Sequence, residues 1–332
     1  MSSSNKITIK EVAQRAGVSI ATVSRYLNNP SSLKEENRRK VEKIAKEANY
    51  QPLMYARRLA GGKLNTFGLV IPGYEDIFYS FYALEIIRGV GMALDKEDLD
   101  LHLHIYSGKD TFKTSLIDGA IFADIIGNEK QVARLVKEEF PVVVINHAIE
   151  DPEISSVAIN NFKGAYEATE FLIHHGHKIV AHLAGDQRVQ CASDRLQGYK
   201  AALKKGNIDL HNDYIKVTNF SRKEAREKLE ELFSLKNPPT AIFCCSDEVA
   251  SEVLAYAEEK RINIPKDLSV VGFDDNPHCL YGNLMLTTVR QPVLKMASLG
   301  VEILRDIVKK KKTPQKITLE TELIVRDTVN FL

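Results

Sequence analysis

The first 64 residues constrain the fold more than any other part of the chain, because they carry closely spaced helix start and stop signals. Thr8 and Glu11 have the spacing of a capping box, which predicts a helix that ends at Gly17. Ser19 can cap a second helix over residues 20–27. Two helices joined by a turn of about three residues form a helix-turn-helix, so an all-α head is expected here.

A third helix is predicted after Pro30, where Ser32 and Glu35 again have capping-box spacing. Its apolar residues recur at helical spacing and predict a face that packs beneath the first two helices. These apolar residues are Val41, Ile44, Ala45 and Ala48.

Residues 53–60 predict a fourth helix, which lies between Pro52 and the Gly61–Gly62 pair. An isolated helix of about eight residues is marginal in water, so it should form only when something supports it. A bound duplex could be that support, with Leu59 in the minor groove and Arg57 near the phosphates. For a monomer in solution, a core role for Leu59 is the better interpretation.

Charge divides the chain unevenly. Residues 1–64 contain 13 Lys and Arg against 5 Asp and Glu, whereas the other 268 residues contain 32 against 39. The overall net charge of +1 therefore conceals a basic head and an acidic body. This distribution is typical of a multidomain chain that binds DNA through one end.

The second helix is the candidate recognition helix. Ile20, Ala21 and Arg25 can reach base edges in a major groove. Other side chains are short and polar, which suits contacts to phosphate oxygens. They are Ser19, Thr22, Ser24 and Asn28. The helix-turn-helix pattern alone is a weak signal, because capped helices at an angle often only pack together; the predicted fourth helix and the charge distribution strengthen it.

These segments, taken together in sequence, spacing and order, resemble the LacI/GalR (lactose-repressor) family of bacterial transcription regulators. The resemblance rests on residues 9–25, Asn28, residues 50–52 and residues 56–59. It implies a homodimer on a pseudo-palindromic double-stranded operator. It also implies further DNA contacts from Thr8, Tyr50, Ala56, Arg57 and Leu59.

From Thr66 onward, predicted strands and helices alternate in two series, which indicates parallel doubly wound sheets in two lobes. The predicted strands are 67–71, 101–105, 119–122, 142–145, 178–183, 214–217, 241–244 and 268–273. The predicted helices are 78–95, 130–138, 162–174, 194–204, 222–233 and 247–260. Residues 107–117 are too few for a full crossover helix, so a short turn or helix is expected there.

The predicted fold is therefore an all-α helix-turn-helix head plus an α/β body, and the body has two doubly wound parallel-sheet lobes. The resemblance implies that these lobes are of periplasmic-binding-protein type. The DNA-binding head would span 1–51, the hinge helix and linker 52–63, and the effector-binding and dimerisation body 64–332. The first lobe would comprise about 64–159 plus 291–318. The second would comprise about 160–290 plus 319–332.

Ligands of parallel sheets bind beyond the carboxyl ends of the strands, and a cleft between two lobes brings both sets of ends together. Residues that follow or face those ends include a guanidinium, a carboxylate, amides and aromatic rings, which together suit a sugar. The candidates are Phe78, Tyr79, Asn146, Arg195, Phe220, Ser246, Asp274 and Gln291. In the resembling family, the positions matching all but Phe78 and Tyr79 surround the effector.

Several alternatives stay open. The same groups could hold a nucleoside or nucleobase, or the body could sense a corepressor protein instead of a small molecule. Asp247 is expected to cap the helix that begins there rather than to bind a ligand. Whether the effector weakens or strengthens operator binding does not follow from the sequence.

Other functions are disfavoured. No nucleophile with its base, phosphate loop or metal cage is recognisable, so neither an enzyme nor a cofactor is expected. The histidines of residues 174–177 fit a helix end better than a metal site, and the four cysteines are expected to be buried thiols. No apolar run is long enough for a membrane span, and no export signal of the kind a periplasmic solute-binding protein needs is visible, so a cytoplasmic location is expected.

Overall fold

The computed structural model describes residues 7–28, 30–48, 50, 64–73, 77, 80–108, 112–281, 283–310 and 313–332. The chain forms two compact units, Met1–Phe67 with Lys113–Asp118, and Gly68–Phe112 with Gly119–Leu332. Residues 7–50 of the first unit are called the head below, and the second unit is called the body. The predicted helix at 53–60 lies outside the described residues, and so do Phe78 and Tyr79.

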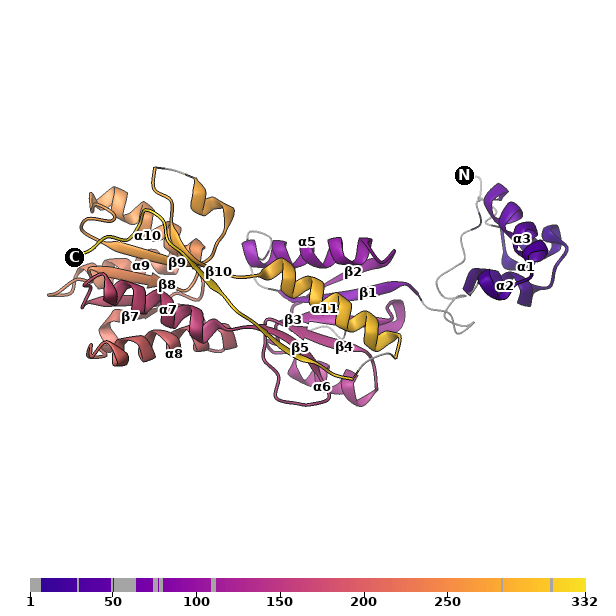
Figure 1. Cartoon of the computed structure of the whole chain (residues 1–332), viewed down its shortest axis with the longest axis horizontal. Coiled ribbons are helices and arrows are strands. Elements are labelled where there is room, and N and C mark those ends of the chain that lie inside the picture. Colours follow the sequence, from indigo (N-terminus) through magenta and orange to yellow (C-terminus); the bar gives the residue numbers. More distant parts are fainter. Residues whose placement is uncertain are drawn as a thin grey trace. The chain divides into compact units, whose positions relative to one another are not determined.

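The head contains helices α1 (Ile9–Ala16), α2 (Ile20–Asn28) and α3 (Glu35–Glu47) (Figure 1). The capping box at the start of α1 is confirmed. The Thr8 Oγ1 atom accepts from the Glu11 N–H at 3.4 Å, and the Glu11 carboxylate accepts from the Thr8 N–H at 2.7 Å. Gly17 ends the helix with φ +65°, a left-handed conformation that glycine adopts without a Cβ clash.

The predicted start of the third helix is wrong. Residues Pro30–Ser32 form a 3₁₀ turn, and α3 begins at Glu35 with Lys34 as its N-cap and no side-chain cap. The acidic residues Glu35 and Glu36 in the first turn stabilise the start of α3 by interacting with the positive end of the helix dipole. Ion pairs four residues apart support the exposed face, as in Glu36–Lys40 at 2.6 Å.

The three helices enclose one small core. Its buried members are Val12, Ala13, Ala16, Val23 and Val41. Ile44 of α3 packs against this cluster, and so does Tyr50 beyond it. The predicted apolar face of the third helix is therefore confirmed at Val41 and Ile44, which hold α3 against α1 and α2.

The first lobe of the body is defined by a six-stranded sheet of order β11-β5-β4-β3-β1-β2. Its strands are β1 (Thr66–Pro72), β2 (Asp100–Tyr106), β3 (Gly119–Ala123), β4 (Val142–Ile145), β5 (Ser155–Ile159) and β11 (Lys316–Leu319). Its helices are α5 (Phe81–Asp95), α6 (Glu129–Lys137) and α11 (Val293–Val308). Helices α5 and α11 pack closely, because a Cβ added at Gly89 would lie 2.7 Å from the Ala297 Cβ (Figure 1).

The second lobe is defined by a sheet of order β12-β10-β9-β8-β6-β7. Its strands are β6 (Val180–Ala184), β7 (Ile215–Val217), β8 (Ala241–Cys244), β9 (Ser269–Asp274), β10 (Thr287–Arg290) and β12 (Glu322–Ile324). Its long helices are α7 (Asn161–His174), α8 (Gln190–Lys205), α9 (Arg222–Phe233) and α10 (Asp247–Lys260). Only β12 pairs antiparallel among the registers of this sheet.

The chain passes between the two sheets three times, after β5, after β10 and after β11. The alternating pattern predicted from the sequence is confirmed, including the short connection before β3, whose described part holds only a 3₁₀ turn at Thr114–Leu116. Strands β5, β10, β11 and β12 were not predicted. Helix α5 begins at Phe81 rather than at residue 78, and α8 begins four residues before its predicted start at Asp194.

Two further expectations concern the cysteines and a membrane span. All four cysteines are buried and unpaired, and burial raises the pKa of the Cys191 and Cys245 thiols to about 12. Among the described residues, no helix is long and apolar enough to cross a membrane.

Candidate DNA interface and effector site

Helix α2 presents its predicted contact residues because its opposite side is fixed in the head core. Val23 is fully buried, whereas Ile20 is 45% exposed and Ala21 and Arg25 are also exposed. Ser19 caps the helix, since its Oγ accepts from the Thr22 N–H at 3.1 Å. The candidate base-contacting residues of α2 therefore face outward, while the opposite side of the helix packs in the head core.

The remaining head candidates differ in exposure. Thr22 and Ser24 are partly buried, Thr8 is exposed, and the Thr8 hydroxyl already donates to Glu11 at 2.9 Å. Tyr50 is partly buried against the head core, and burial raises the pKa of its phenol. Asn28 ends α2, and Ala56, Arg57 and Leu59 lie outside the described residues. The DNA contacts of all these residues stay predictions.

The body brings the predicted effector residues to the carboxyl ends of strands. Asn146 follows β4, Ser246 follows β8, Asp274 ends β9 and Gln291 follows β10. Because β8, β9 and β10 are parallel neighbours, the last three share one edge of the second sheet. Phe220 follows β7, and its ring covers Gly185 so closely that an added Cβ would lie 2.3 Å from the Phe220 Cζ.

Arg195 of α8 is the buried cation of this edge. Its Nε donates to the Asn161 Oδ1 at 2.9 Å and its Nη1 donates to the Cys245 carbonyl at 2.5 Å. Its guanidinium lies over the Phe273 ring, 3.6 Å from the centroid. Asn161, which was not predicted as a site residue, thus positions Arg195 from the first turn of α7.

Asp274 is the buried carboxylate of the same edge, and it accepts a hydrogen bond from the Gln291 Nε2. Burial, reinforced by the neighbouring Asp247, raises the pKa of Asp274 to about 8, while Arg195 opposes the shift. Asp274 also has φ +139°, a conformation that L residues rarely adopt. Such strain is common where a structure holds a side chain for a ligand.

Asp247 does not cap α10 as expected, because Ser246 does: the Ser246 Oγ accepts from the Val249 N–H at 3.3 Å. The Asp247 carboxylate instead accepts from the Asn276 N–H at 2.8 Å and from the Thr288 hydroxyl at 2.6 Å. A buried carboxylate needs such donors, and those available come from β10 and the turn after β9. Asp247 therefore links α10 to β10 and to the turn after β9 at the carboxyl ends of the strands.

The first lobe contributes a polar cluster of its own. Asp124 is 5% exposed and accepts from the Asn146 Nδ2 at 3.4 Å. The His147 Nδ1 lies 3.2 Å from the other Asp124 oxygen. Asp124 was not predicted as a site residue. Its position directly after β3, equivalent to that of Asn146 after β4, was the signal that could have identified it.

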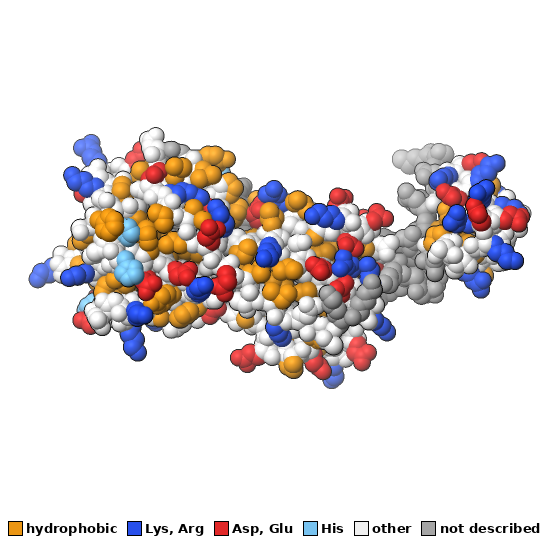
Figure 2. Space-filling view, viewed as in Figure 1, with side chains coloured by type: hydrophobic (Ala, Val, Ile, Leu, Met, Phe, Trp, Pro, Cys, Tyr) orange, Lys and Arg blue, Asp and Glu red, His pale blue; other side chains and the backbone are white. Residues whose placement is uncertain are grey.

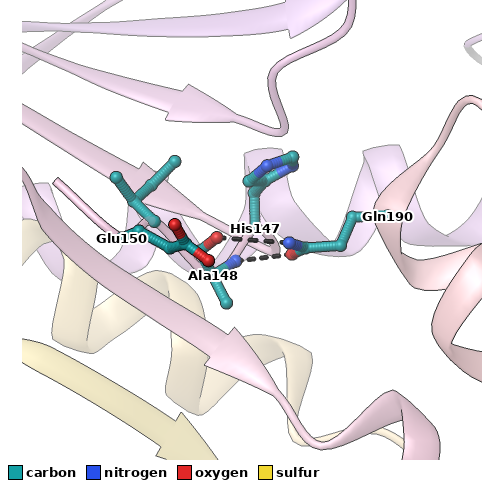
Figure 3. A pocket seen from close by; sticks show the side chains of 5 residues that line it. His147, Ala148, Glu150 and Gln190 are labelled. Atoms are coloured by element: carbon teal, nitrogen blue, oxygen red, sulfur yellow. Dashed lines mark hydrogen bonds between the residues drawn. The ribbon is translucent and has the colours of Figure 1, made fainter.

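Contacts between the lobes are shown in Figure 3. The Ala148 N–H donates to the Gln190 Oε1 at 2.7 Å, and the Gln190 Nε2 donates to the Ala148 carbonyl at 3.2 Å. Ile126 of the first lobe packs with Phe220 against the start of α8. The Gln190–Ala148 pair borders an open pocket of about 420 Å³, lined by His147, Ala148, Ile149, Glu150 and Gln190. This pocket lies beside the predicted effector residues rather than among them.

Two family models match the chain. The model for bacterial regulatory proteins of the lacI family matches residues 8–52, and the periplasmic binding protein-like domain matches residues 169–329. The Probable HTH-type transcriptional repressor ExuR of Bacillus subtilis (strain 168) is 32% identical over 98% of this chain and 99% of its own. The chain belongs to the lacI family of bacterial regulatory proteins.

Other relatives agree with this assignment. The HTH-type transcriptional repressor PurR of Vibrio vulnificus (strain CMCP6) is 31% identical, with 97% of this chain and 98% of PurR covered. A solved complex of the transcriptional regulator CelR with cellobiose is 25% identical, with a TM-score of 0.73 over 97% of this chain and 99% of that chain. The lac repressor dimer bound to operator, at 22% identity, shares the fold with a TM-score of 0.85 over 98% of this chain and all of that chain. The regulator is therefore an HTH-type transcriptional regulator whose head binds DNA and whose body is of the effector-binding type.

Proposed function

We propose that the regulator is a homodimeric repressor whose affinity for a pseudo-palindromic operator changes when a small polyhydroxylated effector binds between its lobes. The observation that carries the effector part is the pair of polar clusters at the strand ends. Arg195, Asp274 and Gln291 belong to one lobe, and Asp124 and Asn146 belong to the other. Buried charges and amides gathered at the carboxyl ends of parallel strands suit a ligand that forms many directional hydrogen bonds.

The DNA part of the proposal assigns roles within the head. Ile20, Ala21 and Arg25 would contact base edges, since they are exposed on one helix. The polar residues around them would contact phosphates and fix the orientation of α2. Residues 1–51 would form the DNA-binding domain, and residues 52–63 would link it to the effector-binding body at 64–332.

A dimer is proposed from exposed apolar side chains of the body. Leu84 and Met92 of α5 are 46% and 50% exposed. In the second lobe, Tyr281 and Met285 are also exposed. Figure 2 shows such side chains in patches on the visible face of both lobes. A second copy would cover these surfaces and place two heads on the two halves of an operator.

A sugar is the preferred effector class, because the CelR complex named above contains cellobiose and shares fold and length with this chain. A catalytic role is not proposed, since the relatives are transcriptional repressors. We infer that the regulator acts in the bacterial cytoplasm, where its operator would be.

The test uses the full chain. Selection of bound duplexes from a random pool, at about 200 mM salt to weaken sequence-independent phosphate contacts, should enrich an inverted repeat, because a two-fold dimer contacts two equivalent half-sites. Fluorescence anisotropy on that repeat, with and without a panel of sugars and nucleosides, should then show an affinity change of roughly 5- to 150-fold for at least one compound. Failure to enrich any duplex would contradict the DNA role. An operator affinity that no compound changes would contradict the effector role but not the DNA role.

A further inference from the structure

The buried amides of the two clusters have fixed orientations. Asn146 directs its Nδ2 to Asp124, and Gln291 directs its Nε2 to Asp274. In both pairs the amide nitrogen is the donor and a carboxyl oxygen of the acidic neighbour is the acceptor. The Asn146 Oδ1 and the Gln291 Oε1 are consequently turned away from those neighbours.

These two carbonyl oxygens are buried and lack a hydrogen-bond partner within the described ranges. They belong to residues that follow strands of different lobes, β4 and β10. Burial without a partner is costly for a polar atom, so most such atoms in native proteins bind a donor. Each lobe therefore supplies an acceptor that a ligand bound between the lobes could satisfy through O–H or N–H groups.

The charges around these acceptors leave little room for an anion. The Arg195 guanidinium lies near Asp274, and the His147 ring lies against Asp124. The half-buried Asp194 is close to both His147 and Arg195 and adds a third carboxyl group. A ligand carboxylate or phosphate would thus lie close to several acidic groups in a poorly solvated site, and the Arg195 Nε and Nη1 that could attract it already donate to Asn161 and to the Cys245 carbonyl.

We infer that the effector is rich in hydrogen-bond donors and carries no anionic group: a neutral sugar or an amino sugar, not a sugar acid or a sugar phosphate. This inference rests on the proposed function, because it specifies the ligand of the same cleft. Hydroxyl or ammonium donors would bind the Asn146 and Gln291 carbonyls and the nearby carboxylates. The Arg195 guanidinium would bind a ring or hydroxyl oxygen.

The test compares matched ligands that differ only in charge. Glucose, glucosamine, glucuronate and glucose 6-phosphate form one set, and cellobiose with cellobionate and ribose with ribose 5-phosphate form two more. Thermal shift followed by isothermal titration of the full chain should find a neutral or amino member that binds. Its acidic or phosphorylated counterpart should bind at least about 30-fold more weakly. The inference is overturned if an anionic member binds as tightly as its neutral counterpart, or if no neutral or amino member binds.

A variant sharpens the test. At pH 9, above the Asp274 pKa of about 8, Asp274→Asn removes one negative charge while keeping the size of the side chain, so the ratio of neutral to acidic affinity measured there should fall about tenfold. Asp209→Asn, at an exposed position of the same lobe, should leave the ratio unchanged. If Asp274→Asn fails to fold, the affinities of the wild-type protein for neutral and anionic ligands still test the inference. Duplex selection is independent of the panel, so an acidic effector that alters operator binding would refute this inference while supporting the proposed function.

Discussion

The head and the body hold their functional residues in different ways. In the head, the polar contacts join neighbours in sequence: Thr8 bonds to Glu11, Ser19 to Thr22, and Glu36 to Lys40. In the body, Arg195 bonds to Asn161 and Cys245, which are 34 and 50 residues away. The head is thus a set of local signals around a small core, whereas the body builds its site from distant segments. Variants in the two regions should differ in both size and kind of effect.

The largest effect is expected in the body. Arg195→Met should lower the free energy of unfolding of the body by about 3–5 kcal/mol, because it leaves two buried acceptors, the Asn161 Oδ1 and the Cys245 carbonyl, without their donor. Urea denaturation followed by far-ultraviolet circular dichroism measures this loss. Arg188→Met is the control, since that side chain is 85% exposed and pairs with Asp186 at the surface. A loss below about 1 kcal/mol for Arg195→Met would contradict the assignment of a buried, essential charge.

The second effect is a pH dependence confined to the body. The pKa of Asp274 is raised to about 8 in the folded protein, above its ordinary value of 3.8, so the folded state keeps a proton that the unfolded state loses. This contribution is complete below about pH 4 and is lost as the pH rises through about 8, by at most about 1.4 kcal/mol per pH unit. The groups facing Asp274 are Asp247, Arg195 and Gln291.

Unfolding curves between pH 5 and 9, compared between wild type and Asp274→Asn, measure that dependence. The wild type should lose stability over this range relative to the variant. Equal slopes for the two proteins would show that Asp274 is ionised throughout and that its burial is better compensated than the structure indicates.

A third prediction concerns recognition by the head. Arg25→Ala should reduce discrimination at one operator base pair by about 1–3 kcal/mol, since an exposed Arg on α2 can bind a guanine edge. Anisotropy on operators mutated one position at a time measures it. Arg39→Ala, in the exposed ion pair of α3 with Glu35, is the comparison. A uniform loss on every duplex would reassign Arg25 to a phosphate contact.

The smallest effect should come from the first helix cap. Thr8→Ala removes the hydroxyl that accepts from the Glu11 N–H and should cost about 1 kcal/mol of head stability. Thr8→Ser keeps that acceptor and should cost less. Thermal unfolding of the full chain, followed by probes in the head, distinguishes the two variants. An identical loss for both would mean that the methyl group, rather than the cap, stabilises the start of α1.

Three of the four strands missed in the sequence share a cause. Strands β10, β11 and β12 have three or four residues each, and their pairing partners are far along the chain, as in Thr288 with Ile324. A short run pairs as a strand only when a neighbour provides its hydrogen bonds, and local pattern does not reveal that neighbour. The error at Ser32 has a related origin: the spacing was suitable, but the 3₁₀ turn from Pro30 moved the helix start to Glu35.

The sequence by itself determined the elements that local forces define: the capped α1, its stop at Gly17, the exposed residues of α2 and the alternation of strands and helices in the body. It also identified which polar residues follow strand ends, because parallel strands direct those ends to one edge. Only the tertiary structure decided the partners of Arg195, Asp247 and Asp124. The physical reason is that a buried charge takes its hydrogen bonds from whichever segments the fold brings within about 3 Å, and sequence distance does not constrain that choice.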